Sequence, residues 1–418
     1  MRVGILTIGN ELISGRTQDT NASLIARTLQ IQGWPVVVIL SVGDDEAAIR
    51  EALGLILAQA DAAVVTGGLG PTADDITTAA IARIFALPLL TDKAVLATIK
   101  SIFEKYRLNW TDNNAKQAVF PAGAEVIPNP VGTAAGFALQ KGNQVVAVIP
   151  GVPREVARML PEGVVPLLRR AFPEAAACVA TRTVKSFGLG EAEVDRALAD
   201  ADWTGMGVEI GFYPHFPENH IVLTARAATD AEAERRLQAA EAAVTGRLGR
   251  HVFSRDGEAL EAVVGRLLSE RGLTLAVAES CTGGLVTDRL TDVPGSSAYL
   301  ERGLVTYSNA AKVALLGVPE AVLAVHGAVS EETARRMAVG VRRQAGTDLG
   351  LAVTGIAGPE GGTAAKPVGT VYIALADADE TVCRRFAFRW DRRRIKMIAA
   401  QSALMMVKRY LAGEVQQA

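Results

Sequence analysis

The chain has 418 residues, of which 49% are hydrophobic and 21% are charged, and its formal net charge is −2. At about 150 residues per domain this length predicts two or three domains, and the composition is too apolar for a disordered chain. The near-neutral charge argues against a broad basic surface for nucleic acid, and the 5% aromatic content argues against base-stacking platforms.

Strand-like and helix-like patterns alternate through the first 170 residues. Strands are predicted at 3–8, 36–40, 62–65 and 145–149, and a helix at 20–32. Asp44 and Asp45 precede a second amphipathic helix, where acidic side chains suit the helix N-terminus. Repeated βα units predict a parallel sheet with helices on both faces, in a domain spanning residues 1–172.

The alternation of strand-like and helix-like patterns changes near Pro173. Strands are predicted at 181–187, 207–213 and 220–228, and helices at 191–200 and 230–248. This βαββα order predicts a small α+β module of KH-like or ferredoxin-like type at 173–254, without the GxxG loop of a nucleic-acid-binding KH domain. We expect it to serve as a connector or dimer-forming module, with its hairpin connection in Phe212–His220.

A second α/β domain is predicted over residues 255–418. Strands are predicted at 273–278, 303–307, 349–353, 369–375 and 381–388, and helices at 309–316, 331–345 and 391–411. The predicted fold class is therefore α/β, with two three-layer α/β domains joined by the small module.

Cysteine usage and the lack of long apolar runs bear on location. Cys178, Cys281 and Cys383 lie far apart, so we expect a reduced, cytoplasmic protein without a disulfide framework. No apolar run reaches 18 residues, so neither a transmembrane helix nor a membrane partner is expected.

Glycine-rich loops follow several strands of the first domain. Residues 66–75, TGGLGPTADD, follow a strand and open a helix, where backbone N–H groups can approach an anion closely. The loop is neither a Walker A nor a GxGxxG motif. Asp74 and Asp75 would repel a bare phosphate, which favours a bridging divalent cation. Alternatively, they only stabilise the helix N-terminus.

The segment Glu279-Ser-Cys-Thr-Gly-Gly284 lies between a predicted strand and a helix of the last domain. A hydroxyl there benefits from the helix dipole, and adjacent N–H groups can form an oxyanion hole. The segment is not a GxSxG elbow. Lys312, five residues after Tyr307, is a candidate base if burial lowers its pKa, and otherwise a surface residue. Cys281 is either the competing nucleophile or a small buried residue.

Two further features of this domain could contact a ligand. The loop at 353–362, VTGIAGPEGG, follows a strand and is rich in glycine. Arg392, Arg393 and Arg394 could clamp a phosphate or form a solvated face. His326 is interpreted as a loop residue rather than a base.

The segments GNELISG, TGGLGPTADD, NPVGTAAGF and PGVPRE resemble the N-terminal domain of the CinA family of competence/damage-inducible proteins. That domain is similar in fold to molybdopterin-binding proteins. The resemblance implies metal-dependent cleavage of ADP-ribose into AMP and ribose 5-phosphate. Ala135 and Val156 depart from the family pattern, but both are apolar replacements.

This resemblance also implies site residues. Asp75, with Asp74 or Glu11, would hold a divalent metal ion, cobalt or magnesium, with potassium as a further candidate. The glycine loops would hold the diphosphate, through Gly67, Gly68, Gly70, Thr72, Asn129, Gly132, Thr133 and Gly151.

The segments AESCTGG, YSNAAK and AVTGIAGP resemble the CinA C-terminal domain, a nicotinamide mononucleotide (NMN) amidase. The resemblance implies hydrolysis of NMN to nicotinate mononucleotide and ammonia without a cofactor. It implies Ser280 as nucleophile, Lys312 as base, Tyr307 assisting proton transfer and Thr354 positioning the amide or its oxyanion. The implied substrate-binding residues are Cys281, Thr282, Gly283, Gly284, Gly355, Gly358 and Arg393.

The leading hypothesis is therefore a two-enzyme pyridine-nucleotide salvage protein, a homodimer whose partners are NMN and ADP-ribose rather than nucleic acid. One alternative is a molybdopterin-binding or adenylylating protein, because fold alone does not settle function. Another is a non-enzymatic regulator of DNA uptake or repair that binds protein partners.

Overall fold

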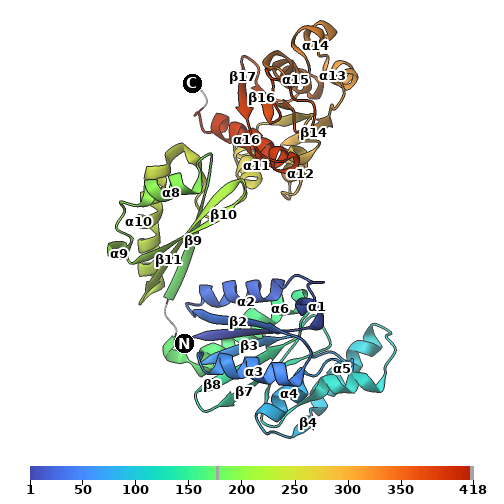
Figure 1. The fold of residues 1–418 in the computed structure, drawn as a ribbon, viewed down its shortest axis with the longest axis vertical. Coiled ribbons are helices and arrows are strands. Elements are labelled where there is room, and N and C mark those ends of the chain that lie inside the picture. Colours follow the sequence, from blue (N-terminus) through green and yellow to red (C-terminus); the bar gives the residue numbers. More distant parts are fainter. Residues whose placement is uncertain (176–177, 415–418) are drawn as a thin grey trace. The chain divides into compact units, whose positions relative to one another are not determined.

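The computed structural model describes residues 1–175 and 178–414. The chain divides into two compact units, Met1–Ala180 with Arg226–Glu234, and Thr181–Ala225 with Arg235–Ala418. Each unit is built around its own sheets (Figure 1). No described helix combines the length and apolarity that crossing a membrane requires.

The N-terminal domain contains a six-stranded sheet in the order β2-β1-β3-β8-β7-β6. Its strands are β1 (Val3–Ile8), β2 (Val36–Val42), β3 (Ala62–Thr66), β6 (Glu125–Ile127), β7 (Gly136–Lys141) and β8 (Gln144–Ile149). The strands β2, β1, β3 and β8 are parallel to one another. Strand β7 is antiparallel to both of its neighbours, β8 and β6, so the prediction of a parallel sheet is wrong at this edge. Only two residues join β7 to β8, and so short a connection allows only an antiparallel hairpin.

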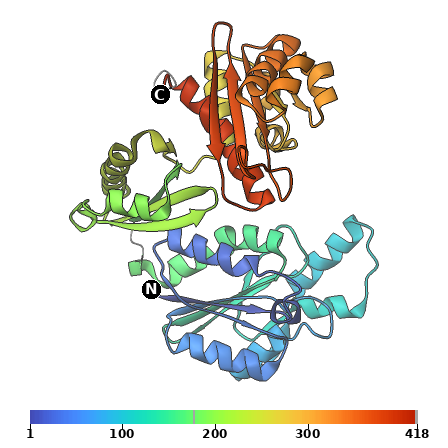
Figure 2. The same cartoon turned by 45° about the horizontal axis from the view of Figure 1, so that its top comes forward.

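Alternate side chains of the N-terminal strands build two hydrophobic cores, one on each face of the sheet. Val3 and Ile5 pack with α2 (Thr20–Ile31) and α6 (Pro153–Met159). Leu6 and Ile8 pack with α3 (Glu46–Leu57) and α4 (Thr77–Ile84). Figure 2 shows this sheet between its two layers of helices, as predicted. The remaining elements are α1 (Asn10–Ile13), β4 (Leu89–Thr91), α5 (Lys93–Lys105), β5 (Val119–Pro121) and α7 (Val165–Ala171).

The small module has a four-stranded sheet in the order β10-β11-β9-β12, in which the pairs β10–β11 and β9–β12 are antiparallel. Its elements are β9 (Cys178–Phe187), α8 (Glu191–Leu198), α9 (Trp203–Met206), β10 (Val208–His215), β11 (Glu218–Ala227), α10 (Asp230–Leu248) and β12 (Val252–Ser254). All five elements of the predicted βαββα order are present, and the structure adds the short helix α9 before β10 and a fourth strand, β12, after α10. The hairpin turn is shorter than expected, because most of Phe212–His220 is strand and His215 already pairs with Glu218.

The C-terminal domain contains a five-stranded sheet in the order β14-β13-β15-β16-β17. The strands are β13 (Leu275–Glu279), β14 (Leu300–Val305), β15 (Leu349–Gly355), β16 (Thr370–Ala376) and β17 (Thr381–Ala387). The helices are α11 (Leu260–Arg271), α12 (Leu285–Thr291), α13 (Asn309–Leu316), α14 (Glu320–His326), α15 (Glu331–Ala345) and α16 (Arg392–Leu411). One face packs against α11 and α16 and the other against α15.

Both α/β sheets change winding direction beside their first parallel strand. In the N-terminal domain β1 lies between β2 and β3, and in the C-terminal domain β13 lies between β14 and β15. The connections therefore leave in opposite directions and open a crevice at the carboxyl ends of these strands, where ligands bind in open α/β sheets.

Close packing of α15 gives the first prediction. A Cβ atom on Gly340 would lie 2.1 Å from the carbonyl oxygen of Leu316, whereas one on Gly54, in α3, would meet nothing within 4 Å. Helix propensity alone favours alanine over glycine by about 1 kcal/mol at both positions. We expect Gly54→Ala to raise and Gly340→Ala to lower the free energy of unfolding, measured by denaturant titration. A gain in Gly340→Ala would contradict this packing.

Candidate functional site

The ends of three parallel strands of the C-terminal sheet carry the predicted catalytic residues. Ser280 directly follows β13, Tyr307 lies two residues after β14, and Thr354 is the second-last residue of β15. Since β14, β13 and β15 are neighbours, these ends share one edge of the sheet. The Ser280 N–H donates to the Val353 carbonyl at 2.9 Å, which holds the serine against β15.

Lys312 and Ser280 form the central contact of this site. The Lys312 Nζ lies 3.1 Å from the Ser280 Oγ, and it also donates to the carbonyls of Thr306 at 2.8 Å and Tyr307 at 3.2 Å. The Lys312 side chain is 1% exposed and Ser280 is 8% exposed. Three acceptors match the three N–H bonds of an ammonium. In a neutral amine, two N–H bonds can remain on the carbonyls while the lone pair faces the serine hydroxyl.

Burial separates the chemistry of Lys312 from that of Cys281. Burial lowers the pKa of Lys312, which favours the neutral amine. Burial raises the pKa of the Cys281 thiol to about 12. The Cys281 Sγ packs against Gly355, since a Cβ atom on that glycine would lie only 3.0 Å from the sulfur. Because a thiol must ionise to be a strong nucleophile, the raised pKa argues against Cys281 and leaves Ser280 as the candidate nucleophile.

Glu279 is a buried carboxylate whose role the sequence did not suggest. Its Oε2 accepts from the N–H groups of Gly284 and Val286 at 3.0 and 3.1 Å. Its Oε1 accepts from the N–H and hydroxyl of Thr287 at 2.9 and 2.7 Å. Its carbonyl accepts from the Thr306 N–H at 2.7 Å. Glu279 thus ties the first turn of α12 to β13 and also holds Thr306, an acceptor for Lys312.

Backbone N–H groups surround the serine on its C-terminal side. Gly283 and Gly284 adopt φ of 62° and 96°, a left-handed conformation that glycine tolerates and that shapes this turn. Within the described residues, the N–H groups of Cys281 and Thr282 donate to no oxygen. These two groups are the candidates for an oxyanion hole.

The other predicted residues of this site differ in how they are engaged. The Thr354 hydroxyl donates to the carbonyl of Ala328 at 2.8 Å, so its proton is already used there. The Tyr307 side chain is 62% exposed, and its hydroxyl accepts from Arg392 at 3.3 Å. Arg392 also donates to the Gly358 carbonyl at 2.6 Å and so joins the loops after β14 and β15.

Of the three consecutive arginines, Arg392 rather than Arg393 reaches these loops. In the described part of the chain, the exposed Arg393 side chain forms no hydrogen bond or ion pair. Lys396, one turn after Arg392, was not predicted as a site residue. Its Nζ lies 3.5 Å from the place of a Cβ on Gly283. Its four-residue spacing from Arg392 on a helix is the signal that could have identified it.

The N-terminal glycine loops meet at a second site, a cavity of about 560 Å³. Its lining includes the predicted residues Glu11, Gly67, Gly68, Gly70, Asp74, Asp75, Thr133 and Gly151. A Cβ on Gly67 would lie 2.1 Å from the Ile8 carbonyl oxygen, and one on Gly151 would lie 3.2 Å from the Gly67 Cα. Only glycine allows this close approach of the ends of β1, β3 and β8.

The remaining predicted residues support this cavity rather than line it. Thr72 donates to the Asp75 Oδ2 through its N–H at 2.8 Å and also through its hydroxyl. Asn129 donates to the Glu155 Oε2 and to the Ala134 carbonyl, both at 2.9 Å. A Cβ on Gly132 would collide with Glu155.

Five carboxylates line the N-terminal cavity: Glu11, Asp44, Asp74, Asp75 and Glu155. Burial raises the pKa of Asp44, and the negative charges of Glu11, Asp74 and Asp75 raise it further. This mutual repulsion suits a divalent cation. Among the described residues, however, no three acidic, His or Cys side chains are close enough to form a metal site by themselves. The donors therefore fit a cation that is also held by a ligand.

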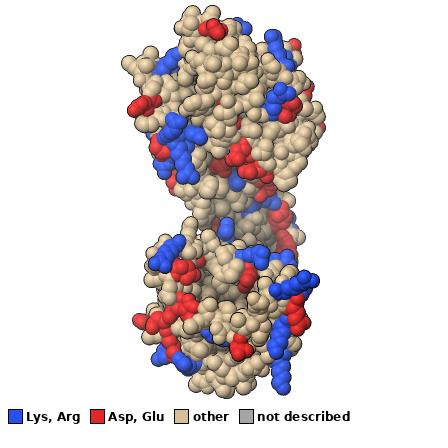
Figure 3. All heavy atoms as spheres, turned by 90° about the vertical axis from the view of Figure 1, so that its right-hand side faces the viewer, with Lys and Arg blue, Asp and Glu red and all other residues tan. Residues whose placement is uncertain are grey.

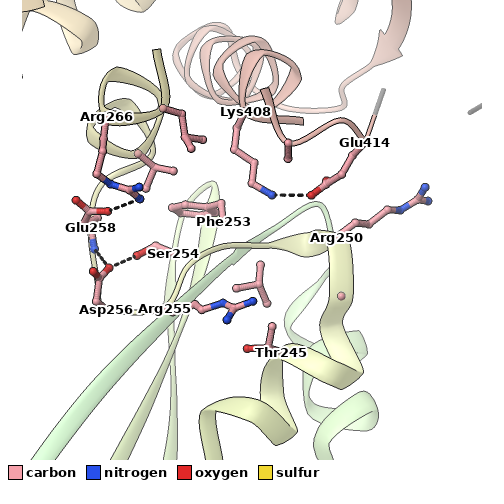
Figure 4. A pocket seen from close by; sticks show the side chains of 15 residues that line it. Thr245, Arg250, Phe253, Ser254, Arg255, Asp256, Glu258, Arg266, Lys408 and Glu414 are labelled. Atoms are coloured by element: carbon pink, nitrogen blue, oxygen red, sulfur yellow. Dashed lines mark hydrogen bonds and ion pairs between the residues drawn. The ribbon is translucent and has the colours of Figure 1, made fainter. Parts of the chain in front are cut away.

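A cavity of about 640 Å³ lies elsewhere, between α10, β12, α11 and the end of α16 (Figure 4). Its acidic groups are already engaged: Glu258 with Arg266, Glu414 with Lys408, and Asp256 with Ser254. It contains none of the predicted catalytic residues, so its size does not make it the active site.

The Glu279 contacts give the second prediction. Glu279→Gln places an amide NH₂ against N–H donors, so two of the four hydrogen bonds are lost in a fully buried position. We expect a loss of about 2–4 kcal/mol in the free energy of unfolding, measured by denaturant titration. Glu301→Gln on β14, whose side chain is 39% exposed, is the control and should change the free energy by less than about 0.5 kcal/mol. Equal effects would contradict the role of Glu279.

Comparisons with known proteins agree with this domain order. The chain matches family models for a probable molybdopterin binding domain at 4–170, the damage-inducible protein CinA KH domain at 181–254 and the CinA C-terminal domain at 257–411. It is 64% identical over 414 residues to a CinA-like protein of Syntrophus aciditrophicus (strain SB), covering 99% of both chains. It is 42% identical over 411 residues to a putative competence-damage inducible protein of Desulforudis audaxviator (strain MP104C), covering 98% of this chain and 99% of that protein.

Among solved structures, the competence damage-inducible protein A (ComA) of Klebsiella pneumoniae is 39% identical. The alignment covers 38% of this chain and 97% of that one, with a TM-score of 0.36. The full-length matches show that this chain belongs to the family of CinA-like proteins.

Proposed function

We propose that the C-terminal domain is an amidase that hydrolyses NMN to nicotinate mononucleotide and ammonia. The observation that carries this proposal is the 3.1 Å contact between the buried Lys312 Nζ and the Ser280 Oγ. A buried amine paired with a hydroxyl at a strand-to-helix turn is an arrangement for nucleophilic acyl transfer. The family resemblance supplies the substrate.

The chemistry follows from the protonation of Lys312. As a neutral amine, Lys312 takes the Ser280 proton while the serine oxygen attacks the carboxamide carbon of NMN. The negative oxygen that forms is stabilised by the N–H groups of Cys281 and Thr282. Lys312 then gives its proton to the leaving nitrogen, which departs as ammonia and leaves an ester on Ser280. Lys312 then deprotonates water, which attacks the ester carbon; as the bond to Ser280 breaks, Lys312 returns the proton to the serine oxygen, and nicotinate mononucleotide is released.

The first turn and a half of α16 supplies the positive charge that the substrate phosphate needs. Lys396 lies beside Gly283, and it forms no ion pair within the described residues. Arg392 lies beside Tyr307. A compact ammonium and a planar guanidinium above the same loops can bind a phosphate together.

A second activity, metal-dependent cleavage of ADP-ribose, is proposed for the N-terminal domain. The observation that favours it is the juxtaposition of close-packed glycine loops with five carboxylates around one cavity. The N–H groups of the glycine loops would bind the diphosphate. Asp75, Asp74 and Glu11 would hold a divalent cation, which when bound neutralises charge on the diphosphate and activates water. Thr72 would keep Asp75 oriented toward the cavity.

The charge distribution is consistent with small anionic substrates. On the face drawn in Figure 3, basic and acidic side chains form small groups on a mostly neutral surface, and no basic patch extends across the face. Four basic residues, Arg392, Arg393, Arg394 and Lys396, gather at the start of α16.

The third prediction tests the amidase residues. Lys312→Met should lower kcat for ammonia release from NMN by about 10²–10⁴-fold, because the base is removed, and Ser280→Ala by at least as much. Lys312→Arg should be equally inactive at every pH, since a guanidinium does not lose its proton. Ser269→Ala, an exposed serine of α11, is the control and should retain the wild-type rate. Near-normal turnover in Ser280→Ala would remove the serine from this role.

The fourth prediction concerns pH. Catalysis needs the neutral amine, and burial lowers the pKa of Lys312 below the ordinary lysine value of about 10.4. The kcat/KM for NMN should therefore rise with pH and then reach a plateau. The midpoint of the rise should lie below the ordinary lysine pKa. A kcat/KM that falls between pH 6 and pH 9 would contradict Lys312 as the base.

The fifth prediction tests the N-terminal activity. With ADP-ribose and Mg²⁺ or Co²⁺, Asp75→Asn should lower the rate of AMP release by about 100-fold, because cation stabilisation of the reacting phosphate contributes several kcal/mol. Asp112→Asn, an exposed acid of the same domain outside the cavity, should not change the rate. If wild-type protein releases no AMP with either metal, the second activity is wrong, and the amidase proposal is unaffected.

A further inference from the structure

The hairpin of the small module contacts the start of α16 within the second compact unit. The Phe216 ring at the β10–β11 turn meets the Trp390 ring edge-to-face, with centroids 5.3 Å apart and planes at 69°. The Arg394 guanidinium lies over both rings, 5.4 Å from the Phe216 centroid and 5.2 Å from that of Trp390. One aromatic side chain of the module thus contacts two residues at the start of α16.

A second contact anchors the same hairpin further along the helix. The Glu218 Oε1 accepts from the Nε2 of the fully buried Gln401 at 3.0 Å. The Glu218 Oε2 lies 3.0 Å from the His220 Nε2, which holds the carboxylate in place. Arg394 and Gln401 are seven residues apart, which is two turns, so both anchors lie on one face of α16.

The opposite face of α16 meets the catalytic loops. Arg392 and Lys396 are four positions apart and share a face, whereas Arg392 and Arg394 are two positions apart and point about 200° away from each other around the helix. Arg392 bonds to the Tyr307 hydroxyl and the Gly358 carbonyl, and Lys396 lies beside Gly283. The first turn of α16 is therefore held between the hairpin and the catalytic loops.

The start of α16 has few other supports. Residues 391–394 are all exposed, whereas the helix is buried in the domain core from Ile395 onward, including Ala399, Ala403 and Leu404. Helix ends with little buried surface open locally at low cost in free energy. The contact with Phe216 accordingly supplies an appreciable part of what orients Arg392.

We infer that Phe216 is a positioning residue for the C-terminal catalytic centre: through Trp390 and Arg394 it fixes the first turn of α16, and thereby Arg392 between Tyr307 and Gly358. This inference rests on the proposed amidase function for its kinetic effect. It makes the small module a working part of the amidase rather than only a connector.

The test uses the full chain and NMN. Phe216→Ala should lower kcat/KM by roughly 2- to 30-fold, the range found for residues that act on a site through a packed network. Trp390→Ala, on the other side of the contact, should have a similar effect. Phe216→Tyr keeps the ring and should retain the wild-type value. Tyr213→Ala, on the same hairpin and 59% exposed, is the matched control and should also retain it.

A double-mutant cycle separates positioning from a general loss of structure. In an Arg392→Ala background, Phe216→Ala should have no further effect on kcat/KM, because both substitutions remove the same constraint. If the two effects multiply, or if Phe216→Ala leaves the wild-type kcat/KM unchanged, the inference is wrong.

A readout without substrate distinguishes this inference from the proposed activity. Amide hydrogen exchange at 356–359 and 392–396 should be faster in Phe216→Ala than in wild type, and unchanged in Tyr213→Ala. This result would support positioning even if wild-type protein released no ammonia from NMN. Unchanged exchange in both segments would overturn it.

Discussion

The C-terminal domain depends on the burial of one amine. Placing the Lys312 Nζ out of water removes its hydration, and an unpartnered buried ammonium is strongly unfavourable. Oxygen atoms from separate segments replace that water: the Ser280 hydroxyl after β13 and the Thr306 and Tyr307 carbonyls after β14. These oxygen atoms meet at Lys312 only because β13 and β14 are neighbours in the sheet, so the sheet order determines the site as well as the core. Glu279 adds to this condition, since its carbonyl fixes Thr306 and its carboxylate fixes the turn after Ser280.

Each α/β domain has a crevice at the equivalent place in its own sheet, but the two crevices are lined by groups of opposite charge type. In both, glycines let strand ends approach closely at the point where the winding reverses. The N-terminal crevice is lined with carboxylates, whose negative charges repel one another. The C-terminal crevice buries a lysine, which burial pushes toward its neutral form. The first arrangement suits attack on a charged diphosphate, and the second suits removal of a proton from a hydroxyl.

Much of the fold could be predicted because its periodicities are local. The strand at 3–8 and the helix at 230–248 occur at the predicted bounds, and the loops predicted to bind ligands follow strands that do share an edge. The antiparallel β6 and β7 could not be predicted from repeated βα units, because strand direction here is set by a two-residue turn. The burial of Lys312 was equally hidden, because a lysine early in a short helix has the pattern of a surface residue. Glu279 was visible in its motif, but its partners lie across a turn whose shape depends on two left-handed glycines.

The run Arg392-Arg393-Arg394 shows why charge patterns underdetermine function. In composition the three residues are equivalent, and a run of arginines is usually a solvated face. On a helix, successive side chains point about 100° apart, so each meets a different environment. Arg392 bonds to Tyr307 and Gly358 in the loops after β14 and β15, Arg393 faces solvent, and Arg394 lies over the rings of Phe216 and Trp390. Which arginine meets which surroundings is decided by the rotation of α16 about its axis, and the buried residues Ile395, Ala399 and Ala403 fix that rotation in the domain core. The core packing of α16 therefore selects the arginine that reaches the loops, and the Asp391 cap, which accepts the Arg394 N–H at 3.0 Å, fixes the residue at which the helix begins.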